Sequence, residues 1–180
     1  MSDVFKPAAF VVLALGLGQA AAQAAELTPT AQTGIGVWYA PGAPANRGLW
    51  RPGDGGERLV LRIRVLNTAG VPVENAFVEL WHADALGVVH ADRYRAGLTT
   101  DNNGGIEVST VLPGYIWGPR HVHLVVTHPE YAELITRVFF KRDPVVAETE
   151  YPELAIFLED GLARGESTLF GEVELVLSAR

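Results

Sequence analysis

The chain has 180 residues, of which 48% are apolar and 19% charged, a composition typical of one globular domain with its own core. The formal net charge of −7 argues against nucleic acid or an anionic membrane surface as a partner. The absence of cysteine excludes a disulfide, a thiolate nucleophile and a lipid-modified cysteine. Any transition metal must therefore be held by nitrogen and oxygen ligands.

Residues 1–25 have the features of a secretory signal peptide. Lys6 precedes the apolar run AAFVVLALGLG, which is too short to span a bilayer, and the small residues of AAQAAE follow it. We expect cleavage after Ala24 or Ala25, giving an exported protein, periplasmic or secreted, without membrane attachment. A short N-terminal membrane anchor is the alternative interpretation.

Residues 26–56 are rich in Gly, Pro and Ala, and they predict an irregular N-terminal arm. Trp38, Tyr39 and Trp50 are the candidate anchors of this arm. Two roles are open for them: tethering the arm to the core, which is the more frequent case, or packing on a second subunit in a homodimer.

Residues 57–180 show short apolar alternations separated by turn signals. The segment DNNGG (101–105) is a strong hairpin signal between two of the expected strands. Strands are expected at 59–66, 76–81, 98–100, 106–112, 121–127, 135–140 and 171–177, and short helical turns at 130–134 and 152–162. This pattern predicts an all-β fold, an antiparallel β-sandwich.

The segment HVHLVV contains two histidines one residue apart on an expected strand. Side chains two residues apart on a strand share a face, so His121 and His123 should project side by side. They are either a metal site or the outward face of an amphipathic strand whose Val122, Leu124 and Val126 point inward.

Further polar residues stand near this strand in the sequence or on strands expected to pair with it: Tyr115, His90, Arg120 and Arg137. Imidazole pairs suit zinc, copper or iron. A tyrosine joining them as phenolate requires a strong Lewis acid, which favours ferric iron. Arg137 lies in an otherwise apolar strand, where an arginine needs an anionic partner or an exposed face. The simpler alternatives are a turn aromatic for Tyr115 and a surface position for Arg137.

The segments VPVENAFVELWHADALG, YRAGLTTDNNGGIEVSTVLPGYIWG, HVHLVV and LITRVFFKRDP together resemble the intradiol ring-cleavage dioxygenases, which act on catechol and protocatechuate with non-haem ferric iron. The resemblance runs from about residue 56 to residue 143. It implies the sandwich fold of that family and a metal site formed by Tyr115, His121 and His123. The part before Tyr115 also resembles transthyretin-like modules, which have no catalytic activity.

The sequence departs from the family pattern at three positions. Val89 stands where the family has its second, axial tyrosine, so the fourth ligand is His90, Tyr94 or water. Gly118 replaces an arginine, whose role Arg120 takes over by this interpretation. Arg137 stands where related enzymes have a glutamine. Loss of one tyrosinate makes the site less selective for ferric iron, so copper or zinc competes better.

The resemblance implies a function for an aromatic diol and O2 as substrates. A catechol-type ring would be cleaved between its two hydroxyl-bearing carbons to give a muconate-type diacid, while Arg137 and Arg120 stabilise the developing negative charge. The alternative function, favoured by Val89, is a β-sandwich binding module that has lost the reaction and holds a metal such as copper.

Overall fold

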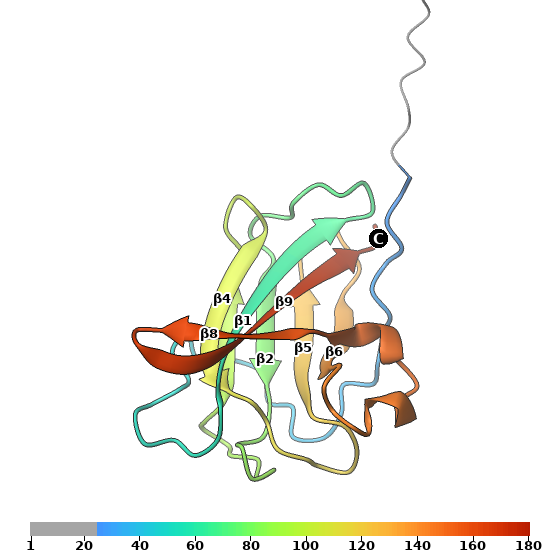
Figure 1. Ribbon diagram of the computed structural model, residues 1–180. Helices are drawn as coiled ribbons and strands as arrows, with labels where there is room; N and C mark the ends of the chain where they lie inside the picture. The colour runs from blue at the N-terminus through green and yellow to red at the C-terminus, as the bar shows by residue number, and fades with distance from the viewer. Residues whose placement is uncertain (1–24) are drawn as a thin grey trace, which may run out of the picture.

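Within residues 25–180, which the structure describes, nine strands form two facing sheets in this computed structural model (Figure 1). One sheet has the order β4-β1-β9-β8 and the other has the order β3-β2-β5-β6-β7. The elements are β1 (Arg58–Asn67), β2 (Phe77–Trp81), β3 (Arg95–Thr99), β4 (Gly105–Val111), β5 (His121–Thr127), β6 (Leu134–Phe140), β7 (Ala155–Ile156), β8 (Leu158–Ala163) and β9 (Glu166–Leu177), with 3-10 turns at Val146–Glu148 and Pro152–Leu154. The predicted all-β sandwich is confirmed.

The core lies between the two sheets and follows the alternation of apolar residues along the strands. On β5, Val122, Leu124 and Val126 point into the core and are fully buried. On β1, the outward-facing Arg62 forms an ion pair with Glu107 of β4 at 3.0 Å. Because successive side chains of a strand point to opposite faces, the remaining side chains of β5, including both histidines, point away from the core.

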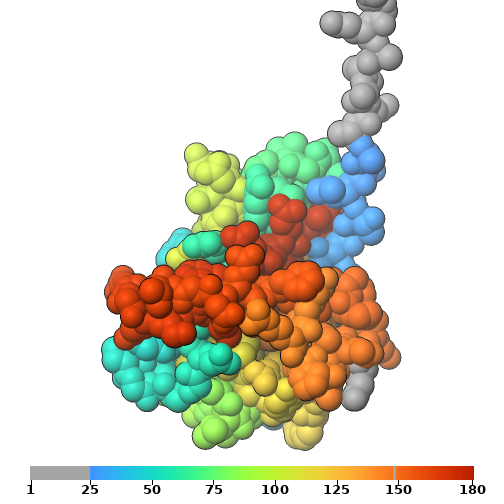
Figure 2. Space-filling model, viewed as in Figure 1, coloured from blue at the N-terminus to red at the C-terminus, as the bar shows by residue number. Residues whose placement is uncertain are grey.

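The two sheets are mixed, although the turn signals predict antiparallel pairing. The two longest strands, β1 and β9, run parallel to each other at the centre of the four-stranded sheet. Strands β6 and β7 of the other sheet are also parallel. Turn signals report only on strands that follow each other in the chain, whereas β1 and β9 are far apart in sequence. Figure 2 shows the hairpin of β8 and β9, in orange and red, lying across the face of the molecule in this view.

The N-terminal arm, residues 26–56, contains no strand. Its ends contact the four-stranded sheet, where the N–H of Thr30 donates to the carbonyl of Val176 on β9 and the N–H of Leu49 donates to the carbonyl of Ser109 on β4, and its middle part lies on the outer face of the five-stranded sheet. The backbone N–H of Thr33 donates to the carbonyl of Ile135 on β6 at 2.8 Å. Farther along, the N–H of Gly42 donates to Glu79 Oε1 on β2 at 2.8 Å. The arm thus covers side chains that would otherwise face solvent.

Neither expected helical turn is observed as predicted: one is shorter than expected and the other is not helical. Only Pro152–Leu154 of the segment 152–162 is a 3-10 turn, and most of the rest belongs to β7 and β8. Residues 130–134 form a turn and an isolated bridge at Tyr131 instead of a helical turn. A short apolar run has no period of its own, so pairing with β9 decides the conformation of β8.

Residues 1–24 lie outside the part of the chain that the structure describes, and the signal peptide expected at 1–25 falls there except for its last residue. From residue 25 onward, no helix is long and apolar enough to cross a membrane.

Candidate functional site

His121 and His123 lie on the outer face of the five-stranded sheet, on β5. In the strand register, His123 is directly opposite Trp81 on β2 and Arg137 on β6. Residues opposite each other on antiparallel strands share a face. The ring of His123 stacks on Trp81 with centroids 4.7 Å apart and planes 4° from parallel. The pair is therefore outward-facing, as one interpretation predicted, yet His123 is only 8% exposed because the arm covers it.

The imidazoles converge through their Nε2 atoms, which lie 3.1 Å apart. His121 Nδ1 lies 2.7 Å from the carbonyl oxygen of Pro119, to which it can only donate, so Nε2 of this ring carries the lone pair. His123 Nδ1 is buried and has no hydrogen-bond partner. Because His121 Nε2 carries the lone pair, His123 Nε2 donates a proton to it in the metal-free protein. Binding of a metal ion by both Nε2 atoms would require that proton to move to His123 Nδ1.

Both histidines are neutral over the physiological pH range. Burial, together with the neighbouring His121 and Arg137, lowers the pKa of His123 to about 3. Burial also lowers the pKa of His121, although the hydrogen bond to Pro119 opposes this. A neutral imidazole presents a lone pair, which is the form that binds a metal ion.

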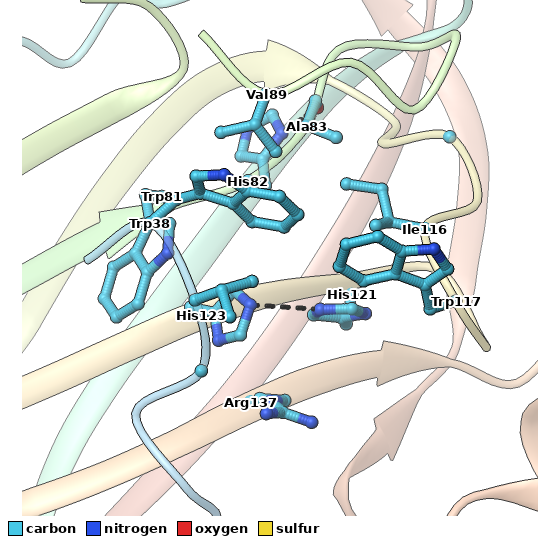
Figure 3. Close-up of a pocket in the computed structure, with 13 residues that line it drawn as sticks. Trp38, Trp81, His82, Ala83, Val89, Ile116, Trp117, His121, His123 and Arg137 are labelled. Carbon is cyan, nitrogen blue, oxygen red and sulfur yellow. Dashed lines mark hydrogen bonds between the residues drawn. The ribbon is translucent and has the colours of Figure 1, made fainter. Parts of the chain in front are cut away.

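The histidine pair lines a cavity of about 150 Å³ (Figure 3). Its walls are mostly apolar and aromatic, and Arg137 is the charged group among them. The lining residues come from the arm, from β2 and the loop after it, from the loop before β5, and from β5 and β6: Gly36, Val37, Trp38, Trp81, His82, Ala83, Val89, Gly114, Ile116, Trp117, His121, His123 and Arg137.

Val89 lies in the wall of this same cavity. The resemblance assigns the second family tyrosine to this position. The side chain at position 89 therefore does face the site, but valine has no atom that can bind a metal ion or accept a proton. At this position of the cavity wall, the resemblance implies an ionisable tyrosine, whereas this chain has an aliphatic side chain.

Tyr115 and Arg120 lie together outside the cavity. The hydroxyl of Tyr115 accepts a hydrogen bond from Arg120 Nη2 at 3.1 Å, and the guanidinium lies 4.6 Å from the ring centroid. The tyrosine side chain is half exposed, although its neighbours Gly114 and Ile116 both line the cavity. The structure thus places Tyr115 at the edge of the site without joining it to the histidines.

His90 and Tyr94 also lie outside the cavity lining. His90 Nε2 is 2.8 Å from Asp84 Oδ2, and its ring packs edge-on against Tyr94. His82, which does line the cavity, has both ring nitrogens in use, with Ala83 O at 2.6 Å and Thr110 Oγ1 at 2.8 Å. His82 therefore has no free nitrogen for a metal ion, and His90 is not among the residues that line the cavity.

The histidine pair fits a metal ion. Two ligands bound at about 2.0–2.1 Å and at right angles lie about 3 Å apart, close to the Nε2 separation seen here. In the described part of the chain, no three His, Cys, Asp or Glu side chains form a metal-binding cluster. A further protein ligand would therefore be of another kind, and Tyr115, whose neighbours Gly114 and Ile116 line the cavity, is the candidate nearest in sequence.

The arm forms the roof of the site, a feature that the sequence interpretation did not identify. Gly36 has φ of +77°, and a Cβ atom there would lie 2.5 Å from Cε1 of His123. Only glycine allows the backbone to pass this close to the ring. One residue in the sequence could have indicated this covering of the sheet: Glu79 is a charged residue on an otherwise apolar strand, and its carboxylate binds the arm.

Glu79 holds the arm in place from below. Its carboxylate, on a residue only 7% exposed, accepts hydrogen bonds from the Gly42 and Ala43 amides at 2.8 and 3.0 Å and from the Tyr39 hydroxyl at 2.8 Å. Burial and the hydrogen bond to Glu79 together raise the pKa of Tyr39 to about 12. The arm is thus attached through a protonated phenol.

Alkaline pH should weaken this attachment. The folded-state pKa of Tyr39 lies above its ordinary value of 10.0, so its contribution to stability is present below pH 10 and disappears as the pH rises toward about 12. We expect the free energy of unfolding to fall more steeply over this range in the wild type than in Tyr39→Phe. Urea unfolding at several pH values measures the difference, and equal slopes would contradict the assignment.

Comparison with known proteins finds similarity to dioxygenases. A family model described as "Dioxygenase" matches residues 36–116. The chain is 31% identical to catechol 1,2-dioxygenase 2 of Acinetobacter lwoffii over 83% of this chain and 64% of that protein. The chain therefore spans just under two thirds of the length of that relative.

Solved structures show the same fold. 3-Chlorocatechol 1,2-dioxygenase from Rhodococcus opacus 1CP aligns with a TM-score of 0.76 and 20% identity, over 84% of this chain and 73% of that one. The dioxygenase domain of a dioxygenase carbohydrate-binding protein fusion from Streptomyces sp. SirexAA-E aligns with a TM-score of 0.75 and 23% identity, over 85% of this chain and 100% of that one. The sequence similarity to a catechol dioxygenase and the shared fold thus support the resemblance to the intradiol ring-cleavage dioxygenases.

Proposed function

We propose that this protein is an intradiol-type dioxygenase that holds one non-haem ferric ion and uses O2 to open a catechol-type ring to a muconate-type diacid. The observation that carries the proposal is the convergence of two neutral imidazoles, with Nε2 atoms 3.1 Å apart, in a largely apolar cavity. When bound, the ferric ion would supply Lewis acidity that favours loss of the diol protons, and the deprotonated diol is electron-rich toward O2.

His121 and His123 would hold the metal through Nε2, and Tyr115 would supply a phenolate oxygen. His121 is pre-oriented for this role by its hydrogen bond to Pro119. The loop that carries Tyr115 is held by Asp143, whose buried carboxylate accepts from the Arg120 backbone N–H at 2.7 Å. These contacts fix the backbone just before His121, between the proposed tyrosine and histidine ligands.

Arg137 would stabilise negative charge on the diol and on the reacting oxygen atoms. It is directly opposite His123 in the register and lines the cavity, and its Nε atom is buried without a hydrogen-bond partner. A fixed cation in a site with few waters acts strongly on developing charge. The apolar walls exclude water from the same space.

The proposal is tested by an optical spectrum of the purified protein after loading with ferric iron, with metal content measured on the same sample. A phenolate bound to ferric iron gives an intense visible charge-transfer band. We expect this band with one iron per chain, and we expect its loss in Tyr115→Phe. A protein that stays colourless and iron-free after loading would overturn the proposal.

A second function is favoured by two observations, Val89 in the cavity wall and Tyr115 outside it. With only the two imidazoles, the site would bind copper in preference to ferric iron and would not cleave the diol. Copper and iron affinities measured side by side, together with oxygen uptake in the presence of catechol, separate the two functions.

We also propose that the protein is exported, on the basis of the sequence of residues 1–25. The mature N-terminus would then be Ala25 or Glu26. Mass spectrometry of protein from periplasmic and extracellular fractions tests this, and an intact N-terminus in the cytoplasmic fraction would contradict it.

A further inference from the structure

Two tryptophans from distant parts of the chain meet beside the histidine pair. Trp38 belongs to the arm and Trp117 to the loop before β5, and both line the cavity (Figure 3). Their rings stack with centroids 5.3 Å apart and planes 20° from parallel. The pair thus joins the roof of the cavity to one of its walls.

These indoles are far more exposed than is usual for tryptophan. Trp117 is 86% exposed and Trp38 is 50% exposed, although tryptophan is highly buried on average. The adjacent Val37 is also half exposed, which extends the apolar surface at the mouth. Exposed apolar surface at a cavity mouth is characteristic of a ligand-binding rim.

Both tryptophans are also held in an unfavourable backbone conformation. Their φ angles are +64° for Trp38 and +44° for Trp117, a region that bulky side chains rarely adopt. Strained residues of this kind cluster at ligand-binding positions. Exposure and strain together give the stacked pair no evident role in stabilising the fold.

The size of the cavity indicates what the pair could bind. At about 150 Å³ the enclosed space is smaller than the roughly 300–1,000 Å³ typical of sites that enclose a drug-sized ligand. A single diol ring could lie beside the histidines, but any large substituent must extend through the mouth. There it would meet the exposed surfaces of Trp38 and Trp117, which are the parts of the indoles not covered by their mutual stacking.

We propose that Trp38 and Trp117 form an aromatic clamp that selects aryl-substituted diols, with the diol ring in the cavity and a second ring against the indoles. This inference rests on the proposed function, because it places the diol at His121 and His123. Ring stacking of this kind contributes roughly a three- to tenfold gain in affinity per indole. The substrate class is therefore a catechol that carries an aromatic substituent.

The test compares the affinities of catechol and 4-phenylcatechol by calorimetry under anaerobic conditions, for the iron-loaded wild type and its variants. We expect a preference for 4-phenylcatechol that falls roughly three- to tenfold in Trp117→Ala and Trp38→Ala, and that Trp117→Phe largely retains. Phe157→Ala, which removes an aromatic side chain that is 69% exposed and outside the cavity lining, is the matched control and should keep the full preference. Thermal unfolding verifies that each variant is folded.

A preference for 4-phenylcatechol in the wild type alone does not test the clamp, because a second ring adds apolar area and can raise affinity without the tryptophans. The test is therefore the change in this preference that the substitutions cause. An equal preference in the wild type and Trp117→Ala would overturn the clamp. Phenol and 4-phenylphenol, which cannot chelate a metal, are compared in parallel on the metal-free protein. If the metal-free protein prefers 4-phenylphenol in a way that depends on the tryptophans, but iron does not bind, the clamp is supported and the iron proposal is overturned. If iron binds but the tryptophans have no effect on the preference, the iron proposal is supported and the clamp is overturned.

Discussion

Replacing His123 with leucine is expected to lower the affinity for ferric iron by more than about 100-fold, because even residues that only support a metal ligand contribute 10–100-fold. Leucine fills a similar volume, so the stacking site against Trp81 is not left empty. His121→Leu should have an effect of the same size, since both Nε2 atoms converge on one point. Competition titration with a chelator measures the affinity.

The matched control for these variants is His128→Leu, which removes a histidine from a partly exposed position in the loop after β5. It should leave iron binding unchanged. If His121→Leu and His123→Leu also bind iron as the wild type does, the metal lies elsewhere and the histidine pair is only a covered strand surface.

Acid is expected to destabilise the metal-free protein, with about 3 kcal/mol of the loss between pH 7 and pH 4 due to His82. Burial lowers the pKa of His82 from 6.5 to about 4. Well above pH 6.5 the residue is neutral in both the folded and the unfolded state. As the pH falls, the unfolded chain binds a proton that the folded protein cannot, so stability is lost progressively down to about pH 4.

His82→Gln isolates this contribution. Glutamine does not titrate, and its amide can still hydrogen-bond to Ala83 O and Thr110 Oγ1, the two partners of the imidazole. Urea unfolding at pH 7 and pH 4 should show a smaller loss of unfolding free energy in the variant than in the wild type. Parallel losses in the two proteins would show that His82 titrates normally.

Much of the fold was predictable because its strands alternate clearly. The segment HVHLVVT was assigned to residues 121–127, and β5 has those bounds. β8 was missed because its outer residues include the exposed Leu162, which spoils the alternation of apolar and polar positions. The parallel pairing of β1 with β9 was missed because no local signal describes a contact between the first and last strands.

The site was predictable only where its residues lie on one strand. The shared face of His121 and His123 follows from their spacing, and the register then brings Arg137 beside them. The roof could not be predicted, because Gly36 and Trp38 reach the histidines through an arm without a regular period. Nor does sequence spacing determine whether the phenol of Tyr115 points into the cavity or, as here, toward Arg120.

The position of β9 has a consequence for how the chain acquires its structure during synthesis. Arg58 pairs with Thr168, so the central strand pair of one sheet joins residues 110 positions apart. Such non-local contacts make folding slow, and they cannot form while the C-terminal segment is still inside the ribosome. The hairpin of β5 and β6 can form early, but the sheet that covers its inner face stays incomplete. A nascent chain therefore remains open to chaperones and proteases until Glu166–Leu177 has emerged.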